Sequence, residues 1–572
     1  MTKTAGKILA VLLSVLMCTG VMTSLPATVF AAETAGNVGG YSLTIDDLTW
    51  TLDDDGTLTI SGNGEMSDDE WDMPSRWWKN IENVIIKDVV IENGVTSIGD
   101  SAFKDCTDLT SVTIPDSVTS IGCDAFSGCE SLTSVTIPDS VASIGDGAFE
   151  GCTGLTSITV AENNSVYDSR NHCNAVIETA TDTLLFGCQN TVIPESVEGI
   201  GGFAFYGCKR LTSVTIPDSV EYIGSSAFYG CSGLTSAAIS NSVTNIDQYA
   251  FFGCKSLTSV TIPDSVKYIG YNAFIGCTGL TSISVAENNS FYDSRNNCNA
   301  IIDTKYNVLL IGCPNTVIPD GVTIINSFAF EACQNLTSIT IPDSVKEIGE
   351  DAFYGCTGLT SITVAENNSV YDSRNHCNAV IETATGKLLF GCQNTVIPDG
   401  VTGIDSFAFN GCTGLTSINI PDSVTSIGYR AFYGCTGLTS VTIPDSVTSI
   451  DDYAFGYYNS DHNYFLKNEG FIIRGSKGSA AEAYANENGF VFIERSAPAV
   501  LVGDVNGDGK VNGADSGVLS RYTSGWDGYE AEIKNMDAAD INGDGKVNGA
   551  DSGILSRYTS GWESAKKYFT AA

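Results

Sequence analysis

A unit of 23 residues recurs through most of the chain, and it limits the possible folds more than any other feature. The unit is clearest from Leu109 to Ser131, and its marker is the pattern Ala-Phe-x-x-Cys. The Phe of this marker stands at 103, 126, 149, 205, 228, 251, 274, 330, 353, 409, 432 and 455, so eight of the eleven steps are 23 residues and three are 56. A unit this short cannot bury its own apolar face, so neighbouring units must stack. The sequence therefore predicts a solenoid.

Within one unit, the order of apolar and turn residues predicts a coil of two short extended pieces and a corner. The letters L-x-x-V-x-I at 109–114 predict a strand, and Pro115 ends it because proline cannot donate to a ladder. Residues 118–121 supply the second extended piece. We expect 124–129 to form a single-turn helical corner that buries its Ala, Phe and Cys.

The full pattern, L-x-x-[VI]-x-IP-x-x-V-x-x-I-x-x-x-AF-x-x-C, resembles the leucine-rich repeats of the BspA type from about Asn83 to Tyr458. The resemblance implies a β-rich repeat solenoid with short strands and helical corners. Repeat arrays of this kind present long surfaces to other macromolecules. We therefore expect a binding or adhesion role for this region.

Eighteen cysteines follow residue 31. Eleven stand in the repeat marker, from Cys106 to Cys435, where a buried thiol behaves as a small apolar group. Cys123 stands alone, and six others form pairs that flank an expected hairpin in each of the three long units: Cys173/Cys188, Cys298/Cys313 and Cys377/Cys392. A disulfide at each pair, contributing about 3 kcal/mol, and a pair of buried thiols both fit this placement.

The first residues have the pattern of an export signal. Lys3 and Lys7 precede an apolar run over 8–21, and Val29-Phe30-Ala31 offers small residues for cleavage after Ala31. An uncleaved membrane anchor is the alternative, but the run is short and interrupted by polar residues. We expect a secreted, extracellular mature protein with no membrane insertion.

Both ends of the repeat region are predicted to be covered, since a solenoid's terminal coils need caps. Residues 41–62 predict two strands joined by a turn at Asp53–Gly56, followed by an acidic, Trp-rich loop over 68–78. Trp50 and the loop's Trp71, Trp77 and Trp78 fit a cap; a carbohydrate-binding platform is the alternative. At the other end, 470–494 predicts a strand, a short helix with one apolar face, and a final strand.

The chain is strongly acidic, with 67 Asp and Glu against 28 Lys and Arg and a net charge of -39. Such a surface repels nucleic acid and anionic membranes, so we exclude both as default partners. It suits divalent-cation binding and extracellular solubility.

Two C-terminal segments, 503–526 and 539–562, repeat each other at an offset of 36 residues and contain D-x-N-x-D-G-x-x-N-x-x-D. This spacing of oxygen ligands is typical of a calcium loop. Carboxylates gathered in one loop repel one another without a cation, so folding should depend on calcium. We predict two ions, with these ligands: Asp504, Asn506, Asp508, Asn512 and Asp515 with the Lys510 carbonyl, and Asp540, Asn542, Asp544, Asn548 and Asp551 with the Lys546 carbonyl.

Position twelve of each loop is Asp rather than the Glu of calcium sensors, and the tandem loop and helix resembles a type I dockerin. The resemblance implies a small all-α calcium-binding domain that binds a cohesin module of a cellulosome scaffoldin, in either of two orientations because the copies nearly match. A purely structural calcium clip is the alternative, but it would not need the exposed helix residues to recur. The implied partner-binding positions are Gly513, Ala514, Val518, Leu519, Arg521 and Tyr522, and Gly549, Ala550, Ile554, Leu555, Arg557 and Tyr558.

No catalytic constellation stands out. The three histidines are His172, His376 and His462; the first two are followed directly by a Cys, which is poor geometry for a nucleophile and its base. The one acidic cluster that fits a glycosidase pair is Glu65, Asp68, Asp69 and Glu70. We expect no enzyme activity.

The sequence thus predicts a non-catalytic recognition or adhesion protein, attached at the cell surface to a cellulosome and binding a protein or polysaccharide through its repeats. The alternatives are a passive structural spacer and a carbohydrate-active hydrolase that uses the Trp-rich N-terminal region. The predicted boundaries are 1–31 signal peptide, 32–95 N-terminal β cap, 96–458 repeat solenoid with three long hairpin-bearing units, 459–495 C-terminal cap, 496–500 linker and 501–572 dockerin.

Overall fold

The fold is described by a computed structural model for residues 29–31, 41–45, 47–66, 85–459, 465–495, 502–507, 510–526, 532–534, 536–542, 546–561 and 565. The chain divides into two compact units, which are treated separately below. The first contains residues 1–418, 427–438 and 451–467, and the second contains 419–426, 439–450 and 468–572.

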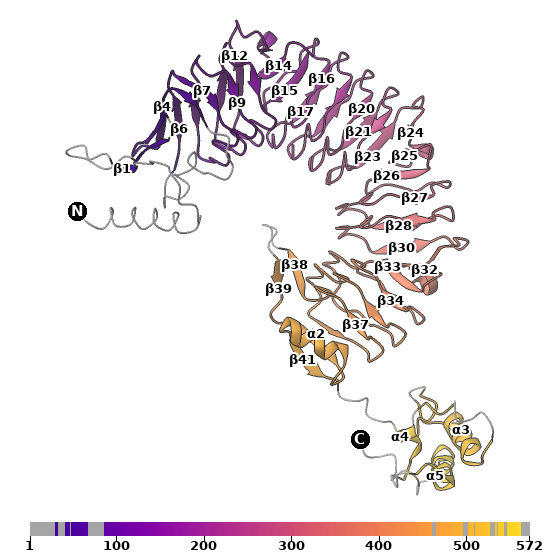
Figure 1. Ribbon diagram of the computed structural model, residues 1–572. Coiled ribbons are helices and arrows are strands. Elements are labelled where there is room, and N and C mark those ends of the chain that lie inside the picture. Colours follow the sequence, from indigo (N-terminus) through magenta and orange to yellow (C-terminus); the bar gives the residue numbers. More distant parts are fainter. Residues whose placement is uncertain are drawn as a thin grey trace. The chain divides into compact units, whose positions relative to one another are not determined.

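Most 23-residue coils contribute two short strands, and many of these strands pair in parallel with the equivalent strand of a neighbouring coil. Ser134 lies opposite Ser157, and Ile121 lies opposite Ile144. A register of one repeat places identical residue types side by side, so every coil turns the same side chains inward. Figure 1 shows the strands of successive coils in chain order.

The first strands of the coils are β6 (Asp88–Ile91), β8 (Ser111–Thr113), β10 (Ser134–Ile137), β12 (Ser157–Val160), β17 (Ser213–Thr215), β19 (Ser236–Ala238), β21 (Ser259–Ile262), β23 (Ser282–Val285), β28 (Ser338–Ile341), β30 (Ser361–Val364) and β36 (Ser440–Thr442). The second strands are β7 (Val95–Ile98), β9 (Ser120–Ile121), β11 (Ser143–Ile144), β16 (Gly199–Ile200), β18 (Tyr222–Ile223), β20 (Asn245–Ile246), β22 (Tyr268–Ile269), β27 (Ile324–Ile325), β29 (Glu347–Ile348), β34 (Gly403–Ile404), β35 (Ser426–Ile427) and β37 (Ser449–Ile450). The two extended pieces predicted for each unit are therefore present in most coils; the coil of Leu415 has an isolated bridge, Asn419 to Thr442, in place of its first strand.

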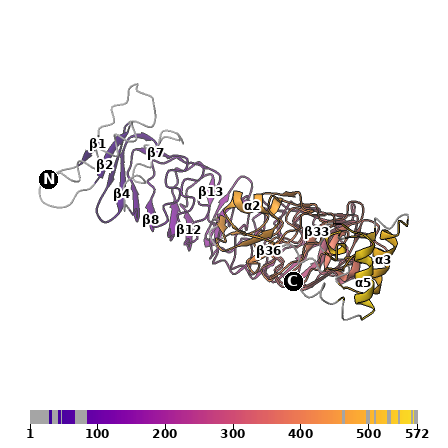
Figure 2. The same cartoon turned by 90° about the horizontal axis from the view of Figure 1, so that it is seen from below.

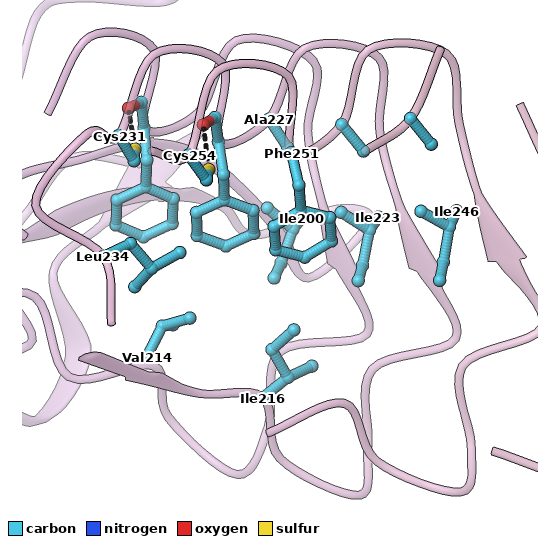
Figure 3. Close-up of a cluster of buried hydrophobic side chains, with 14 of the residues drawn as sticks. Ile200, Val214, Ile216, Ile223, Ala227, Cys231, Leu234, Ile246, Phe251 and Cys254 are labelled. Atoms are coloured by element: carbon cyan, nitrogen blue, oxygen red, sulfur yellow. Dashed lines mark hydrogen bonds between the residues drawn. The ribbon is translucent and has the colours of Figure 1, made fainter. Parts of the chain in front are cut away.

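The core consists of columns of identical side chains. The marker Phe rings of adjacent coils stack with centroids between 4.6 and 5.3 Å apart. A row of isoleucines, Ile200, Ile223 and Ile246, runs beside them (Figure 3). The buried Cys254 thiol donates to the Phe228 carbonyl at 3.2 Å, which satisfies a backbone acceptor as well as filling space (Figure 3). The predicted Phe, Ile and Cys columns are confirmed.

The corners differ from the expected single helical turn. Residues 124–129 form consecutive turns, with left-handed backbone at Asp124 (φ 56°) and Gly128 (φ 76°). The N–H groups of Asp124 and Phe126 donate to the carbonyls of Asp146 and Ala148 in the next coil, at 3.0 and 2.7 Å. A helix would use these donors within itself, so the coil-to-coil ladder replaces the helical turn.

Each long unit inserts a hairpin whose cysteines are free thiols. In the first, β14 (Ala175–Glu178) pairs antiparallel with β15 (Thr183–Gly187), and Cys173 and Cys188 are buried and unbridged. Burial raises the pKa of both thiols. The hairpin's Phe186 continues the Phe column beside Phe149 (5.6 Å). The remaining elements of the long units are β13 (Tyr167–Asp168), η2 (Arg170–His172), β24 (Tyr292–Asp293), η3 (Arg295–Asn297), β25 (Ala300–Asp303), β26 (Val308–Gly312), β31 (Tyr371–Asp372), η4 (Arg374–His376), β32 (Ala379–Glu382) and β33 (Lys387–Gly391).

An asparagine attaches each hairpin to the coil before it. The Asn164 amide donates to the carbonyls of Pro138 and Val141, and its oxygen accepts from the N–H groups of Val166 and Tyr167, all between 2.7 and 2.9 Å. Asn289 and Asn368 repeat this arrangement. The second Asn of each E-N-N-S segment is therefore structural.

The N-terminal cap has more strands than predicted. β2 (Tyr41–Ile45), β3 (Leu48–Leu52) and β4 (Thr57–Gly62) form an antiparallel meander where two strands were expected. β4 then pairs in parallel with β6, and β5 (Gly64–Glu65) with β7, so the meander continues both rows of strands. β1 (Val29–Ala31), at the predicted cleavage site, pairs with β2.

Trp50 supports the cap interpretation. Its side chain is buried, and its ring lies 6.3 Å from the Phe103 ring of the first coil. A sugar-stacking platform would need an exposed indole, so Trp50 does not serve as one. Trp71, Trp77 and Trp78 lie outside the described residues.

The C-terminal cap has the predicted order. β40 (Ile472–Gly475) pairs in parallel with β36, helix α2 (Ala480–Asn488) follows, and β41 (Val491–Glu494) pairs with β40. Ala481, Tyr484 and Ala485 form the buried face of α2, as expected. In the other unit, β38 (Tyr457–Asn459) pairs antiparallel with β39 (Phe465–Lys467).

Candidate functional site

The C-terminal domain consists of two copies of a loop and a helix. The first helix, α3 (Gly513–Thr523), contacts the second, α5 (Gly549–Thr559), with Thr523 Oγ1 3.1 Å from Ser552 Oγ (Figure 2). A short helix, α4 (Met536–Ala539), lies between them in the chain. The buried core is small: Val505, Leu519, Ala539, Ile541 and Leu555.

In the first loop, a buried carboxylate joins the end of the loop to its beginning. Asp515, at position twelve, is fully buried, and its Oδ1 accepts from the N–H groups of Val505 and Asn506 at 3.0 and 3.1 Å. Its Oδ2 accepts from the Asn512 N–H at 2.9 Å. These bonds close the loop and bring position twelve beside positions two and three.

The second loop closes in the same way. Asp551 is fully buried and accepts from the N–H groups of Asn542 and Asn548 at 3.1 and 3.0 Å. Each following helix begins with the same cap: the Asn512 and Asn548 side chains accept from the N–H groups of Ala514 and Ala550 at 2.8 Å. Two loops 36 residues apart thus share one local geometry.

The donor set of these loops fits calcium. It contains carboxylate, amide and backbone carbonyl oxygens without thiolate or imidazole, which is the chemistry that calcium prefers. The closure by Asp515 gathers the oxygen-bearing positions of the first loop. Asp508 and Asp544 lie outside the described residues, and within the described ranges no group of three or more His, Cys, Asp or Glu side chains is assembled. The twelve ligands therefore stay predictions.

Burial separates the twelve predicted partner residues into two groups. Leu519 and Leu555 are fully buried in the domain core, so they cannot touch a partner, and their prediction as contacts is wrong. The half-buried Val518, Tyr522 and Ile554 pack against that same core. The exposed members are Gly513, Ala514, Arg521, Gly549, Ala550 and Arg557; Tyr558 is half-buried.

One exposed residue was missed by the sequence analysis. Trp526, just after α3, is 61% exposed, and its N–H donates to the Arg521 carbonyl at 3.1 Å. Trp and Arg are the residues most enriched at energetic centres of protein interfaces. The repeated S-G-W that ends each copy was the signal for it.

Among the described residues, the structure brings no candidate catalytic side chains together. His172 is exposed on η2 while the neighbouring Cys173 is buried, and His376 and Cys377 repeat this separation. Glu65 is exposed. Asp68, Asp69, Glu70 and His462 lie outside the described residues.

Comparison with protein families gives two matches. The model of the BspA type leucine rich repeat region matches residues 79–182, 185–301, 311–383 and 389–475. The model of the dockerin type I domain matches residues 502–559.

Solved structures of three bacterial proteins are similar to the chain. A leucine rich cell surface protein from Faecalibacterium prausnitzii is 27% identical, with 74% of this chain and 96% of that chain covered and a TM-score of 0.37. A leucine-rich repeat protein from Eubacterium ventriosum is 21% identical, with 74% and 98% covered and a TM-score of 0.36. One from Bacteroides ovatus is 26% identical, with 70% and 94% covered and a TM-score of 0.30. No curated protein matches the chain.

Stacked coils and a duplicated loop-helix domain define a leucine-rich-repeat solenoid with an appended docking module. The chain belongs to the BspA-type leucine-rich repeat family, whose model matches more than half of its residues, and it ends in a type I dockerin. Dockerins of this type bind calcium and attach to cohesins of cellulosomes, and both modules are non-catalytic in kind. In the described part of the chain, no helix is long and apolar enough to cross a membrane.

Proposed function

We propose that this chain is a secreted, non-catalytic recognition protein held on a cellulosome scaffold at the cell surface. Its repeats bind a protein or a polysaccharide, and its dockerin binds a cohesin module only when calcium fills both loops. The observation that carries the docking part is the pair of closed loops, in which the buried Asp515 and Asp551 accept backbone N–H groups in the same way.

Calcium supplies positive charge at the place where the carboxylates of each loop converge. Asp504, Asp508 and Asp515 place three carboxylates in one twelve-residue segment, and the second copy does the same. A cation that neutralises them contributes its binding free energy to folding. The exposed Arg521 and Arg557 recur on equivalent helix faces, so either copy can face the cohesin after a half-turn.

The recognition part is supported by the regular polar face of the first strands. Thr136 Oγ1 lies 3.0 Å from Thr159 Oγ1, and Thr261 Oγ1 lies 2.9 Å from Ser284 Oγ. Exposed hydroxyls repeated from coil to coil offer hydrogen bonds to an extended partner.

A panel of purified cohesin modules tests the docking part. The full chain should bind at least one cohesin with calcium present, and Asp504→Ala combined with Asp540→Ala should abolish that binding. The double substitution Asp116→Ala and Asp139→Ala, in the exposed repeat turns, is the matched control and should change nothing. Binding undiminished by EDTA would contradict the calcium-dependent assignment.

A further inference from the structure

The three long units interrupt the hydrogen-bond ladder of the corners. At uninterrupted junctions, the residue before the marker Ala donates its N–H to the next coil, as Ser226 does to Gln248 and Tyr249 to Tyr271, both at 3.0 Å. At the long units, Gly187 instead donates to the Ala204 carbonyl at 2.8 Å, and Gly312 and Gly391 do the same at their own junctions. Among the described residues, the N–H groups left over, those of Gly147, Asn272 and Asp351, form no backbone–backbone hydrogen bond.

A hollow lies at the first interruption. Its volume is about 320 Å³, and it is lined by Cys123, Asp124, Asp146, Gly147, Glu150 and Phe203. A side-chain carbon added at Gly147 would come within 2.7 Å of Asp124 Oδ1 and 3.1 Å of a Glu150 carboxylate oxygen. Two carboxylates therefore converge beside the unpaired Gly147 N–H.

The aromatic wall of this hollow is Phe203, which stands at the left-handed position of its corner. Its φ is 60°, and the equivalent residues Asp124, Ser226 and Tyr249 of other coils have φ of 56°, 56° and 58°. The left-handed backbone therefore belongs to the corner of the repeat. What the coils after the long units share is a Phe at this place: Phe203, Phe328 and Phe407. Phe203 is 37% exposed, so its side chain is accessible to a ligand.

The charges of the hollow disfavour an anionic occupant. Asp124 is already paired with Lys104 Nζ at 2.7 Å. Burial, and then the neighbouring Asp124, raise the pKa of Glu150, while burial and Glu150 raise the pKa of Tyr206 to about 12. A negatively charged ligand would be repelled by Asp146 and Asp124, and a cation would find one of the three carboxylates already occupied.

We propose that this hollow binds a neutral hexose unit of a polysaccharide. The exposed face of Phe203 would stack on the C–H face of the sugar ring, the Gly147 N–H would donate to one hydroxyl, and Glu150 and Asp146 would accept from others. A volume of about 320 Å³ accommodates a small ligand of this kind. This inference rests on the proposed recognition role of the repeats and names its ligand class.

Affinity electrophoresis of the full chain tests the inference, with gels containing mixed-linkage β-glucan, xyloglucan or galactomannan. We expect retardation in at least one of these gels, and we expect Phe203→Ala to weaken the binding about tenfold, equivalent to about 1.4 kcal/mol. Glu150→Gln keeps the oxygen acceptor and should weaken binding less than Glu150→Ala. Tyr249→Ala, at the same repeat position of an uninterrupted junction, is the control and should leave retardation unchanged.

Two outcomes would overturn the inference. One is that none of the gels retards the native chain, or that the native chain and Phe203→Ala are retarded equally while both show the same melting curve. The other is binding of polylysine, lost in Phe203→Ala, without any binding of the neutral glucans, which would assign the hollow to a basic peptide. Cohesin binding of the same variants is measured in parallel, so that a failure of polysaccharide binding is distinguished from a failure of the docking function.

Discussion

The repeat region and the dockerin both arise from internal duplication, but they obtain stability differently. A coil stacks its Phe, Ile and Cys on the next coil and uses its corner N–H groups there, so the repeats contain their own stabilising contacts. In the described part of the dockerin the buried hydrophobic cluster is small, and the carboxylates Asp515 and Asp551 are buried. We therefore expect the first region, with its large apolar core, to fold without metal, and the second, with its buried negative charge, to depend on a cation.

The largest expected effect is the loss of the buried loop carboxylates. Replacing Asp515 and Asp551 with Ala removes the acceptors of several buried N–H groups, each worth about 1–3 kcal/mol, and also removes calcium ligands. We expect the dockerin transition to disappear from the calorimetric trace of the full chain while the repeat transition keeps its midpoint. A dockerin transition that survives the replacement of Asp515 and Asp551 would contradict the expectation that these carboxylates stabilise the domain.

The Phe column provides the corresponding test in the repeats. Phe251 is fully buried between Phe228 and Phe274, so Phe251→Ala should destabilise the repeat transition by about 3–5 kcal/mol. Tyr271→Ala, at a ring that is 50% exposed, should cost less than about 0.5 kcal/mol. Equal losses of unfolding free energy for the two variants in denaturant titrations would mean that the Phe column is not the core.

The cysteines should make a smaller contribution as thiols. We expect the chain after residue 31 to release 18 titratable thiols in denaturant without reductant, and dithiothreitol to leave the repeat transition unchanged. Cys254→Ala, which removes the donor to the Phe228 carbonyl, should cost about 1 kcal/mol. Twelve thiols instead of 18 would show that the three hairpin pairs are disulfides.

The smallest expected effect is electrostatic. Burial, and then Glu350, raise the pKa of Asp351, so its protonated form is favoured in the folded state. Its stabilising contribution is complete in acid and is lost as the pH rises through the raised pKa. Asp351→Asn should therefore stabilise the repeats at neutral pH by less than about 1 kcal/mol and by nothing at acidic pH. Asp116→Asn, in an exposed turn, is the control.

Residue patterns that act over one repeat were predictable from the sequence. The strands, the Phe and Cys columns and the order of the C-terminal cap follow from apolar spacing and from Pro and Gly positions. The conformation of the corners could not be predicted, because the stacking of the coils decides whether an N–H group bonds within its own corner or to the next coil. The third strand of the N-terminal cap was missed because only two residues separate β2 from β3 in the sequence.

The candidate site was predictable only in part for the same reason. The loop spacing indicated oxygen ligands, but it did not show that Leu519 and Leu555 face the core between the two helices. Phe203 was also missed, because its importance comes from a hairpin that interrupts the corner ladder 16 residues earlier in the chain.

Hydrogen exchange of the full chain with calcium and with EDTA tests the contrast between the two regions most directly. We predict that amides of 510–526 and 546–561 lose their protection when calcium is removed, while amides of the coils from Phe205 to Phe274 exchange at unchanged rates. Unchanged protection of the dockerin helices in EDTA, or an equal loss of protection in the coils, would contradict the account.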